Sequence, residues 1–365
     1  MSGLRIGLAG SGFMGRAHAL AFTNVGAVFD LPDRPVLELI ADRDEATAEL
    51  ARASLGFARA TADWRLMVAD PAVDAVAIAT PNILHAPIAL AAIAVGKPVY
   101  CEKPLAATLA EALAMTEAAE AAGVATQVGF TYLHNPMVAY ARALIASGEI
   151  GEVTTVRVIH AEDFMASPQA PYGWRCEPDN AGGALADIGS HAIAMARFLA
   201  GDIASVSASL RTVHATRPGP TGAPLPVHVD DTADATVIFA SGAAGTISAS
   251  WIESGRLMGL GFEISGTKGG LSFRQERFNE LRLFRAGGRG FTLLEAGPDH
   301  PPYGAFCPAP GHQLGYGDLK TIEVRAFLAA VAGEASGFGF REAYEVDRVA
   351  DAMRRSSAER KWINL

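Results

Sequence analysis

The sequence predicts an α/β protein with an N-terminal doubly wound parallel sheet and a C-terminal α/β domain built on a large, mostly antiparallel sheet. Two observations lead to this prediction. Up to about residue 130, short apolar runs alternate with helix-like segments. Beyond that point, strand-like segments follow one another at the spacing of hairpins. We therefore expect one domain over 1–130 and a second over 131–365, with the final helix, 342–359, as a candidate to pack back on the first domain.

A glycine-rich turn follows the first apolar run. Residues 6–9 predict a buried strand, residues 16–22 look like the opening of a helix, and between them stands Gly10-Ser11-Gly12-Phe13-Met14-Gly15. A tight strand-to-helix turn needs the first glycine, close approach of the backbone to a pyrophosphate needs the second, and close helix–strand packing needs the third. Free N–H groups at the helix start then face an anion. The turn is a candidate dinucleotide site, and a purely structural turn is the alternative.

An acidic residue, Asp42, stands at the end of the second predicted strand, 36–41. In a dinucleotide fold an acid at this place accepts hydrogen bonds from the adenosine ribose and disfavours a 2′-phosphate. Arg43 follows directly and is able to pair with such a phosphate, so NAD is favoured and NADP is not excluded. The alternative for Asp42 is that it caps the predicted helix over 45–55.

The spacing between the glycine turn and this acid is unusually long. Asp42 follows Gly10 by 32 residues, whereas about 20 are usual. Segment 23–35 contains Gly26, Pro32 and Pro35. We expect it to be an insertion that absorbs the difference.

Three more strands, 73–79, 98–101 and 126–130, alternate with helices over 87–95 and 106–122. Ligands of doubly wound sheets bind beyond the carboxyl ends of the strands. The polar residues that follow these strands are therefore expected to join the glycine turn in one site. They are Thr80, Pro81 and Asn82, with His85 close behind, and Glu102 and Lys103.

Lys103 precedes a proline, which favours an extended conformation and holds it on the loop after its strand. An ammonium group there is able to lie near a substrate oxygen and the nicotinamide. A solvated surface lysine is the alternative interpretation.

Asp187 and His191 are spaced i, i+4 at an expected helix start, so their side chains should point the same way. Histidine is the usual general acid or base near neutral pH. An aspartate favoured by the helix dipole beside a hydrogen-bonded histidine explains the pair equally well. A metal site is the weaker interpretation, because the pair offers two ligands and no third is evident.

The second half of the chain predicts helices and strands in a different order. We expect helices over 136–148, 191–199, 321–331 and 342–359, and loops over 217–226 and 297–311. The expected strands are 153–160, 205–213, 233–240, 245–251, 261–265, 270–274 and 280–285.

Composition narrows the class of protein. The chain has 365 residues, half of them hydrophobic, and a formal net charge of −9, which argues against nucleic-acid or anionic-membrane partners. Cys101, Cys176 and Cys307 are far apart and form neither a disulfide framework nor a metal-ligand pattern. Without a recognisable leader or a long apolar run, a cytoplasmic location is expected.

Four motifs occur in the order seen in a known family. They are Gly10–Gly15, 79–82, 102–104 and 182–191. In these motifs the sequence resembles the glucose–fructose oxidoreductase, inositol dehydrogenase and rhizopine catabolism (Gfo/Idh/MocA) family over essentially the whole chain. The glutamate–lysine–proline motif together with the Asp187/His191 pair makes the resemblance specific.

The resemblance implies an NAD(P)-dependent dehydrogenase that oxidises a secondary hydroxyl of a sugar, anhydrosugar or cyclitol, and dimers or tetramers built on the C-terminal sheet. It implies a catalytic trio of Lys103, Asp187 and His191, with His191 as the base. The further residues that it implies near the nicotinamide and substrate are Trp174, Arg175, Asp163 and Tyr132. The alternatives are an oxidoreductase that never releases its cofactor, and a sugar or cofactor sensor without chemistry.

Overall fold

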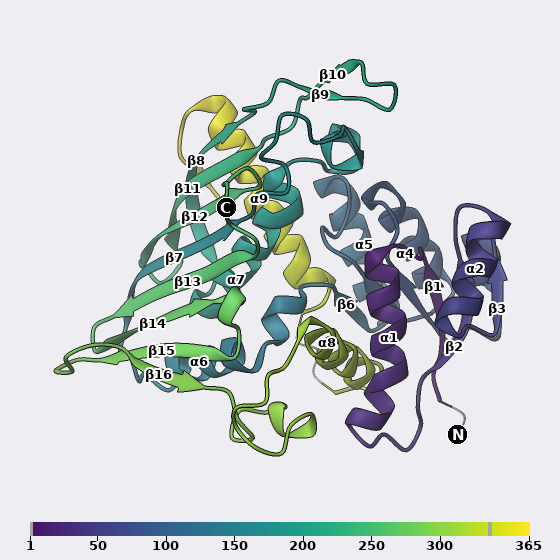
Figure 1. Cartoon of the computed structure of the whole chain (residues 1–365), viewed down its shortest axis with the longest axis horizontal. Helices are drawn as coiled ribbons and strands as arrows, with labels where there is room; N and C mark the ends of the chain where they lie inside the picture. The colour runs from purple at the N-terminus through teal and green to yellow at the C-terminus, as the bar shows by residue number, and fades with distance from the viewer. Residues whose placement is uncertain (1–2, 335–337) are drawn as a thin grey trace. The chain divides into compact units, whose positions relative to one another are not determined.

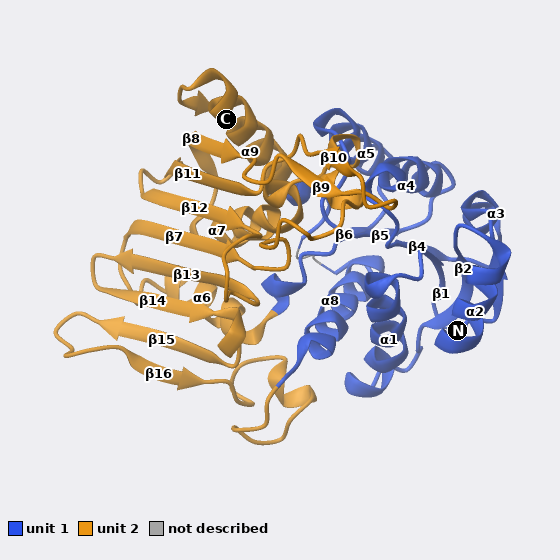
Figure 2. Cartoon of the chain, turned by 45° about the horizontal axis from the view of Figure 1, so that its top comes forward, with its two compact units in different colours: residues 1–134, 314–344 blue, residues 135–313, 345–365 orange. Residues whose placement is uncertain are grey.

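The computed structural model describes residues 3–334 and 338–365 and contains one large parallel sheet and one large mixed sheet. The chain divides into two units (Figures 1 and 2). The described residues within 1–134 and 314–344 form the first unit, and those within 135–313 and 345–365 form the second.

The first unit has six parallel strands in the order β3-β2-β1-β4-β5-β6. The strands are β1 (Arg5–Ala9), β2 (Val36–Ala41), β3 (Arg59–Thr61), β4 (Ala75–Ile78), β5 (Val99–Cys101) and β6 (Thr126–Val128). Its helices are α1 (Phe13–Val28), α2 (Glu45–Leu55), α3 (Trp64–Ala69), α4 (His85–Ala94), α5 (Leu109–Ala122) and α8 (Tyr316–Val331). This order confirms the doubly wound sheet, whose direction of winding changes between β1 and β4. Strand β3 was not expected, because three residues are too few for a periodic pattern.

Segment 23–35 is not the expected insertion. Helix α1 continues to Val28, because Phe22, Val25 and Gly26 extend its buried face. Gly26 lies so close to Arg34 that a Cβ there would be 2.5 Å from the Arg34 Cγ. The long spacing to Asp42 is therefore taken up mainly by a longer helix, and only a short connection precedes β2.

The first unit includes a helix that comes from far along the sequence. Helix α8 lies beside α1 (Figure 1), and its Val324 and Phe327 belong to the same hydrophobic core as Phe22 and Tyr100. The structure thus departs from the expected division at residue 130, since the chain returns to the first unit at 314. Periodicity shows that 321–331 is helical but does not show which core its apolar face enters.

The second unit is built on nine strands in the order β16-β15-β14-β13-β7-β12-β11-β8-β17. The strands are β7 (Val153–Ala161), β8 (Ile203–Arg211), β11 (Thr232–Phe239), β12 (Ala244–Ser250), β13 (Gly259–Gly266), β14 (Gly269–Arg274), β15 (Glu280–Arg285), β16 (Thr292–Glu295) and β17 (Ile363–Asn364). Only β7 and β12 pair in parallel; the other neighbours are antiparallel. The large, mostly antiparallel sheet is confirmed.

One face of this sheet is covered by helices and the other is open. Helix α7 (Ser190–Ala200) packs on β7, β12 and β13, and α6 (Pro136–Ala146) packs on β15 and on α7. Along β7, Val156 and Val158 are buried while Arg157 and Ile159 are exposed. Segment 217–226 contains a short hairpin of β9 (Thr216–Pro218) and β10 (Pro224–Pro226) where we expected only a loop.

Most of the final helix, α9 (Phe340–Glu359), belongs to the second unit and not to the first. In β8, the Ala208 N–H donates to the Ser356 hydroxyl at 2.9 Å, and the Leu210 N–H donates to the Ser357 hydroxyl at 2.9 Å. The division between the units falls inside this helix, after Tyr344. Among the described residues, no helix is long and apolar enough to cross a membrane.

Candidate active site

The three glycines of the first turn differ in whether their surroundings leave room for a side chain. Gly10 has a φ of +93°, and a Cβ there would lie 2.5 Å from the Ala79 carbonyl oxygen. A Cβ on Gly15 would collide with the carbonyl oxygen of Gly10. A Cβ on Gly12, in contrast, would meet no described atom within 4 Å. The packing of the chain therefore requires Gly10 and Gly15 but not Gly12, which leaves open backbone of the kind that a pyrophosphate approaches.

The start of helix α1 has the properties of an anion site. Its N-cap, Gly12, provides no side-chain hydrogen bond to the first turn, so the helix dipole and the N–H groups face outward. Phe13 is 74% exposed and its ring stacks on Tyr316 with centroids 5.9 Å apart. The Tyr316 hydroxyl donates to the Met14 Sδ at 3.3 Å. The turn is therefore braced by helix α8 on one side.

Asp42 is tied to the glycine turn. Its Oδ2 accepts hydrogen bonds from the Ser11 backbone N–H at 2.8 Å and the Ser11 hydroxyl at 2.5 Å. The alternative role as a helix cap is wrong, because Asp44 caps α2 by accepting from the Thr47 N–H at 2.7 Å. Arg43 is largely exposed and its Nε lies 3.2 Å from Asp44. The structure thus places the acid of β2 beside the glycines, as the dinucleotide interpretation requires.

The loops after β4 and β5 are joined by a buried histidine. The His85 ring places Nε2 3.1 Å from the Thr80 carbonyl oxygen and Nδ1 3.0 Å from that of Pro104. Burial lowers the pKa of His85. Pro81 precedes a short 3₁₀ turn that begins at the buried Asn82. His85, which we expected at the cofactor, therefore stands behind the two loops and links them.

Glu102 also faces inward. Its Oε1 accepts from the Lys320 ammonium at 2.8 Å and lies 2.8 Å from the His18 Nε2. Burial by itself raises the pKa of Glu102, but Lys320 and His18 hold it far below its usual range. Burial likewise opposes the charge of Lys320, while Glu102 and Glu323 raise its pKa. Lys320, Glu323 and His18 were not predicted, because nothing in the sequence indicates that α8 and α1 bring these side chains to the end of β5.

Lys103 follows Glu102 at the end of β5. It is partly buried rather than fully exposed, which argues against a freely solvated lysine. Tyr132 lies in the same unit, in the 3₁₀ turn Thr131–His134, with its ring centroid 6.3 Å from that of Tyr316. The first unit therefore holds Lys103 and Tyr132, and the second unit holds the other residues of the predicted trio.

Asp187 and His191 are both 7% exposed. The expected α-helical start is instead one π turn, Leu185–Gly189, that runs directly into α7. Such turns are rare and occur often at functional sites. Asp187 lies in this π turn and His191 in the first turn of α7, and the expectation that their side chains point the same way stays a prediction.

Asp187 is held by an arginine. The Arg175 Nε donates to the Asp187 Oδ2 at 2.7 Å. The same guanidinium lies 4.3 Å from the centroid of the Trp174 ring and 5.5 Å from that of Phe164. The structure thus brings three predicted residues, Trp174, Arg175 and Asp187, into one cluster. Phe164 joins it from the loop after β7.

His191 has a second histidine beside it. The His160 and His191 ring centroids are 5.6 Å apart. His160 is buried, with Nδ1 2.9 Å from the Ile188 carbonyl oxygen and Nε2 3.0 Å from the Glu162 Oε1. Strand β7 therefore anchors the turn that carries Asp187 and His191. The alternation of apolar and polar residues predicted that His160 belongs to this strand. It did not predict the contact of His160 with Ile188 or with His191.

Two adjacent carboxylates support this part of the second unit. Asp230 accepts from the Leu185 N–H at 2.7 Å, at the start of the π turn, and burial raises its pKa. Asp231 accepts from the Trp251 Nε1 at 2.7 Å and from the buried Arg217 at 3.1 Å. The roles of Asp230 and Asp231 were not predicted either, because their hydrogen-bond partners are not their neighbours in the sequence.

Arg217 extends this support to the loop after β7. It donates to the carbonyl oxygens of Met165 at 3.0 Å and Ser167 at 3.1 Å. Asp163, in the same loop, accepts from the Gly255 N–H at 2.9 Å. The loop that carries Asp163 and Phe164 is therefore fixed from both ends. Among the described residues, no group of three or more His, Cys, Asp or Glu side chains is placed to hold a metal ion.

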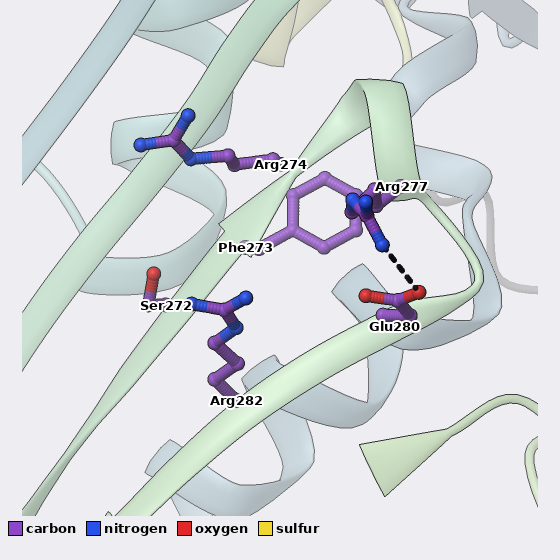
Figure 3. A pocket seen from close by; sticks show the side chains of 6 residues that line it. All are labelled: Ser272, Phe273, Arg274, Arg277, Glu280 and Arg282. Atoms are coloured by element: carbon purple, nitrogen blue, oxygen red, sulfur yellow. Dashed lines mark hydrogen bonds and ion pairs between the residues drawn. The ribbon is translucent and has the colours of Figure 1, made fainter. Parts of the chain in front are cut away.

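The open face of the large sheet carries two hollows that are separate from this cluster. One, of about 330 Å³, is lined by Arg157 and Ile159 among others. A smaller one, of about 30 Å³, is lined by Ser272, Phe273, Arg274, Arg277, Glu280 and Arg282 (Figure 3). Within it the Arg277 guanidinium lies 3.4 Å from the Glu280 carboxylate (Figure 3). Since successive residues of β7 point to opposite faces, these hollows lie on the face opposite to His160.

Family models match both parts of the chain. Residues 4–130 match the oxidoreductase family with an NAD-binding Rossmann fold, and residues 138–272 match the Gfo/Idh/MocA C-terminal domain. The chain belongs to the Gfo/Idh/MocA family. Membership confirms the predicted family, the doubly wound nucleotide-binding domain and NAD as the cofactor. This Gfo/Idh/MocA protein is therefore an NAD-dependent oxidoreductase.

Full-length relatives support the assignment. Levoglucosan dehydrogenase of Pseudarthrobacter phenanthrenivorans is 38% identical over 385 aligned residues, with 100% of this chain and 99% of that protein covered. The solved structure of a levoglucosan dehydrogenase in complex with NADH and levoglucosan is 39% identical with a TM-score of 0.96, and covers 100% and 99% of the two chains. An NAD-binding oxidoreductase from Klebsiella pneumoniae is 43% identical with a TM-score of 0.95 and the same coverage.

Gly12→Ala and Gly15→Ala should separate cofactor binding from folding. Gly12 has a φ of −62° and open space around its Cα, so alanine there should leave the thermal unfolding temperature nearly unchanged and weaken NADH binding about tenfold or more. Alanine at Gly15 should cost roughly 2–4 kcal/mol of stability through its collision with Gly10. Fluorescence titration with NADH and thermal unfolding measure both. Wild-type affinity in Gly12→Ala would contradict the role given to the turn.

Proposed function

We propose that this protein oxidises a secondary hydroxyl of a sugar, anhydrosugar or cyclitol with NAD as the acceptor. The observation that carries the proposal is the placement of two buried acid–base side chains on consecutive turns, Asp187 in the π turn and His191 at the start of α7, with Arg175 bound to Asp187 at 2.7 Å. A relative with the same fold, aligned over nearly its whole length, is named for its complex with NADH and the anhydrosugar levoglucosan. The anhydrosugar is therefore the first member of the class to test.

His191 is the general base of this proposal. Its imidazole takes the hydroxyl proton. NAD, when bound, would supply the acceptor for the hydride from the same carbon, which would become a carbonyl carbon. Asp187, held in place by Arg175 at 2.7 Å, orients the substrate hydroxyl or the imidazole. Lys103 stabilises the developing alkoxide with its ammonium group. Proton and hydride are thereby both accounted for.

The remaining predicted residues take binding roles. Trp174 and Arg175, stacked at 4.3 Å, form the wall near the nicotinamide and substrate. Asp163 and Tyr132 are assigned to the substrate pocket. On the cofactor, Asp42 is the acceptor for the adenosine ribose and selects NAD over NADP. Arg43 is largely exposed and its Nε lies 3.2 Å from Asp44; the comparison of NAD with NADP below tests whether it pairs with a 2′-phosphate.

His191→Ala should reduce turnover by roughly 10²–10⁴ and leave NADH affinity unchanged, because the substitution removes the base but no residue of the nucleotide-binding turn. Steady-state kinetics and NADH titration measure the two effects. His228→Ala is the matched control, since His228 is an exposed histidine of the same unit. Near wild-type turnover in His191→Ala would show that another group is the base.

A cofactor and substrate screen tests the reaction itself. Levoglucosan, myo- and scyllo-inositol, glucose, galactose and xylose are offered with NAD and, separately, with NADP, and reduction is followed at 340 nm. We expect NAD to be reduced with at least one of them. If NADH binds but nothing is oxidised, the substrate class is wrong. Nicotinamide released from the purified protein would then indicate a retained cofactor, and its absence would indicate a sensor.

We also propose that two or four copies associate through the open face of the nine-stranded sheet. This face combines exposed apolar surface at Ile159, 39% exposed, with charges of both signs at Arg157, Arg274 and Glu263 in the larger hollow. A surface with both signs is able to pair with its own copy across a two-fold axis.

Ile159→Asp should therefore yield monomers, because it places an unpaired charge in the centre of the proposed contact. Light scattering after size-exclusion chromatography measures the mass. Leu50→Asp is the control, since Leu50 is an exposed apolar residue of helix α2. An unchanged mass in Ile159→Asp, or a wild type that is already monomeric, would exclude this face.

A further inference from the structure

A cluster of charged side chains lies buried in the first unit, beneath the end of β5. The Lys320 ammonium lies 2.8 Å from the Glu102 carboxylate and 2.7 Å from the Glu323 carboxylate. The Tyr100 hydroxyl is 3.1 Å from the same ammonium. Lys320 and Glu323 are 0% exposed and Glu102 is 5% exposed. None of these groups takes part in the proton transfer described above.

The cluster carries one more carboxylate than ammonium. His18 faces Glu102, and His134 lies 3.9 Å from Glu323; burial lowers the pKa of both histidines, which keeps them neutral. Burial also raises the pKa of the Tyr100 hydroxyl, and it raises that of the Tyr316 hydroxyl to about 12, so both stay protonated. Two carboxylates and one ammonium remain, which leaves one excess negative charge.

Glu323 supplies this excess charge without needing it for its hydrogen bonds. Its Oε2 accepts from Lys320 at 2.7 Å and from the Thr131 hydroxyl at 2.8 Å. Its Oε1 is buried and accepts no hydrogen bond within the described residues. A glutamine of the same shape accepts the same two hydrogen bonds through its amide oxygen. What the carboxylate adds over the amide is therefore its charge.

The cluster lies on the nicotinamide side of the sheet. In a doubly wound sheet the dinucleotide crosses the carboxyl ends of the strands, with the adenosine on the half that contains β2 and the nicotinamide on the half that contains β4 and β5. Asp42 marks the adenosine half, and Glu102 follows the last residue of β5. The oxidised nicotinamide ring carries a positive charge, whereas the reduced ring is neutral.

We propose that the buried cluster of Glu102, Lys320 and Glu323 makes the site favour oxidised over reduced cofactor, and that Glu323 determines this preference. A fixed excess charge on buried side chains acts on the oxidised ring with less of the screening that salt gives at a surface. The Lys103 charge is present in every variant below and cancels in the comparison. The proposal rests on the NAD site alone and not on the choice of substrate.

The test is Glu323→Gln, titrated separately with NAD⁺ and NADH at pH 7 by calorimetry. We expect the ratio of the NAD⁺ to the NADH dissociation constant to rise about tenfold, which corresponds to about 1.4 kcal/mol, the size of effect that one buried charge exerts at an intermediate dielectric. Glu120→Gln is the matched control, because Glu120 is an exposed carboxylate paired with Arg341 in the same unit. Its ratio should stay at the wild-type value.

A charge-conserving variant separates charge from structure. Glu323→Asp keeps the carboxylate charge and leaves the Lys320–Glu102 pair in place, so its ratio should stay near the wild-type value. An unchanged ratio in Glu323→Gln, or equal weakening of NAD⁺ and NADH, would overturn the proposal. Failure of Glu323→Gln to fold would also overturn it, because the carboxylate would then do more than supply charge. If the protein oxidises no sugar but the ratio of the two dissociation constants changes as expected, only the substrate assignment is wrong.

Discussion

The buried ion pair between Lys320 and Glu102, at 2.8 Å, is the interaction on which the organisation of the nucleotide-binding unit depends. It joins a helix from residues beyond 314 to a strand end near residue 102. Desolvation makes such a pair expensive, and removal of one partner typically costs 3–5 kcal/mol. The two charges are tolerated because Glu323, His18 and Tyr100 surround them with polar contacts. The loop that carries Lys103 thereby starts from a rigid base.

In the second unit, two neighbouring aspartates accept hydrogen bonds that hold the segments around the candidate site. Asp230 fixes the start of the π turn, and Asp231, through Arg217, fixes the loop after β7. Each carboxylate thus holds a different segment that carries predicted site residues. The side chains proposed to act on substrate therefore stand on backbone segments that are themselves held by buried polar groups. Such support is what keeps an acid–base pair in a defined geometry.

Much of the site was predictable because its residues stand at the ends of parallel strands and in the turn between the first strand and the first helix. Gly10 and Gly15 are required by close packing in any strand–turn–helix unit, and Asp42 stands where β2 ends. The predictions failed where the sequence signal is shared by several structures. The proline-rich segment 23–35 looked like an insertion, although half of it continues α1. The burial of His85 between the two loops was not expected either, while its assignment to the cofactor stays a prediction.

The sequence by itself determined the alternation of strands and helices, the glycine turn and the pairing of Asp187 with His191 in one segment, because local spacing expresses these features directly. Only the tertiary structure decided that helix α8 returns to the first unit, that α9 stays mainly with the second, and that Lys320 lies under Glu102. These features depend on contacts between residues more than a hundred positions apart. The apolar face of a helix shows that it is buried but does not show against what.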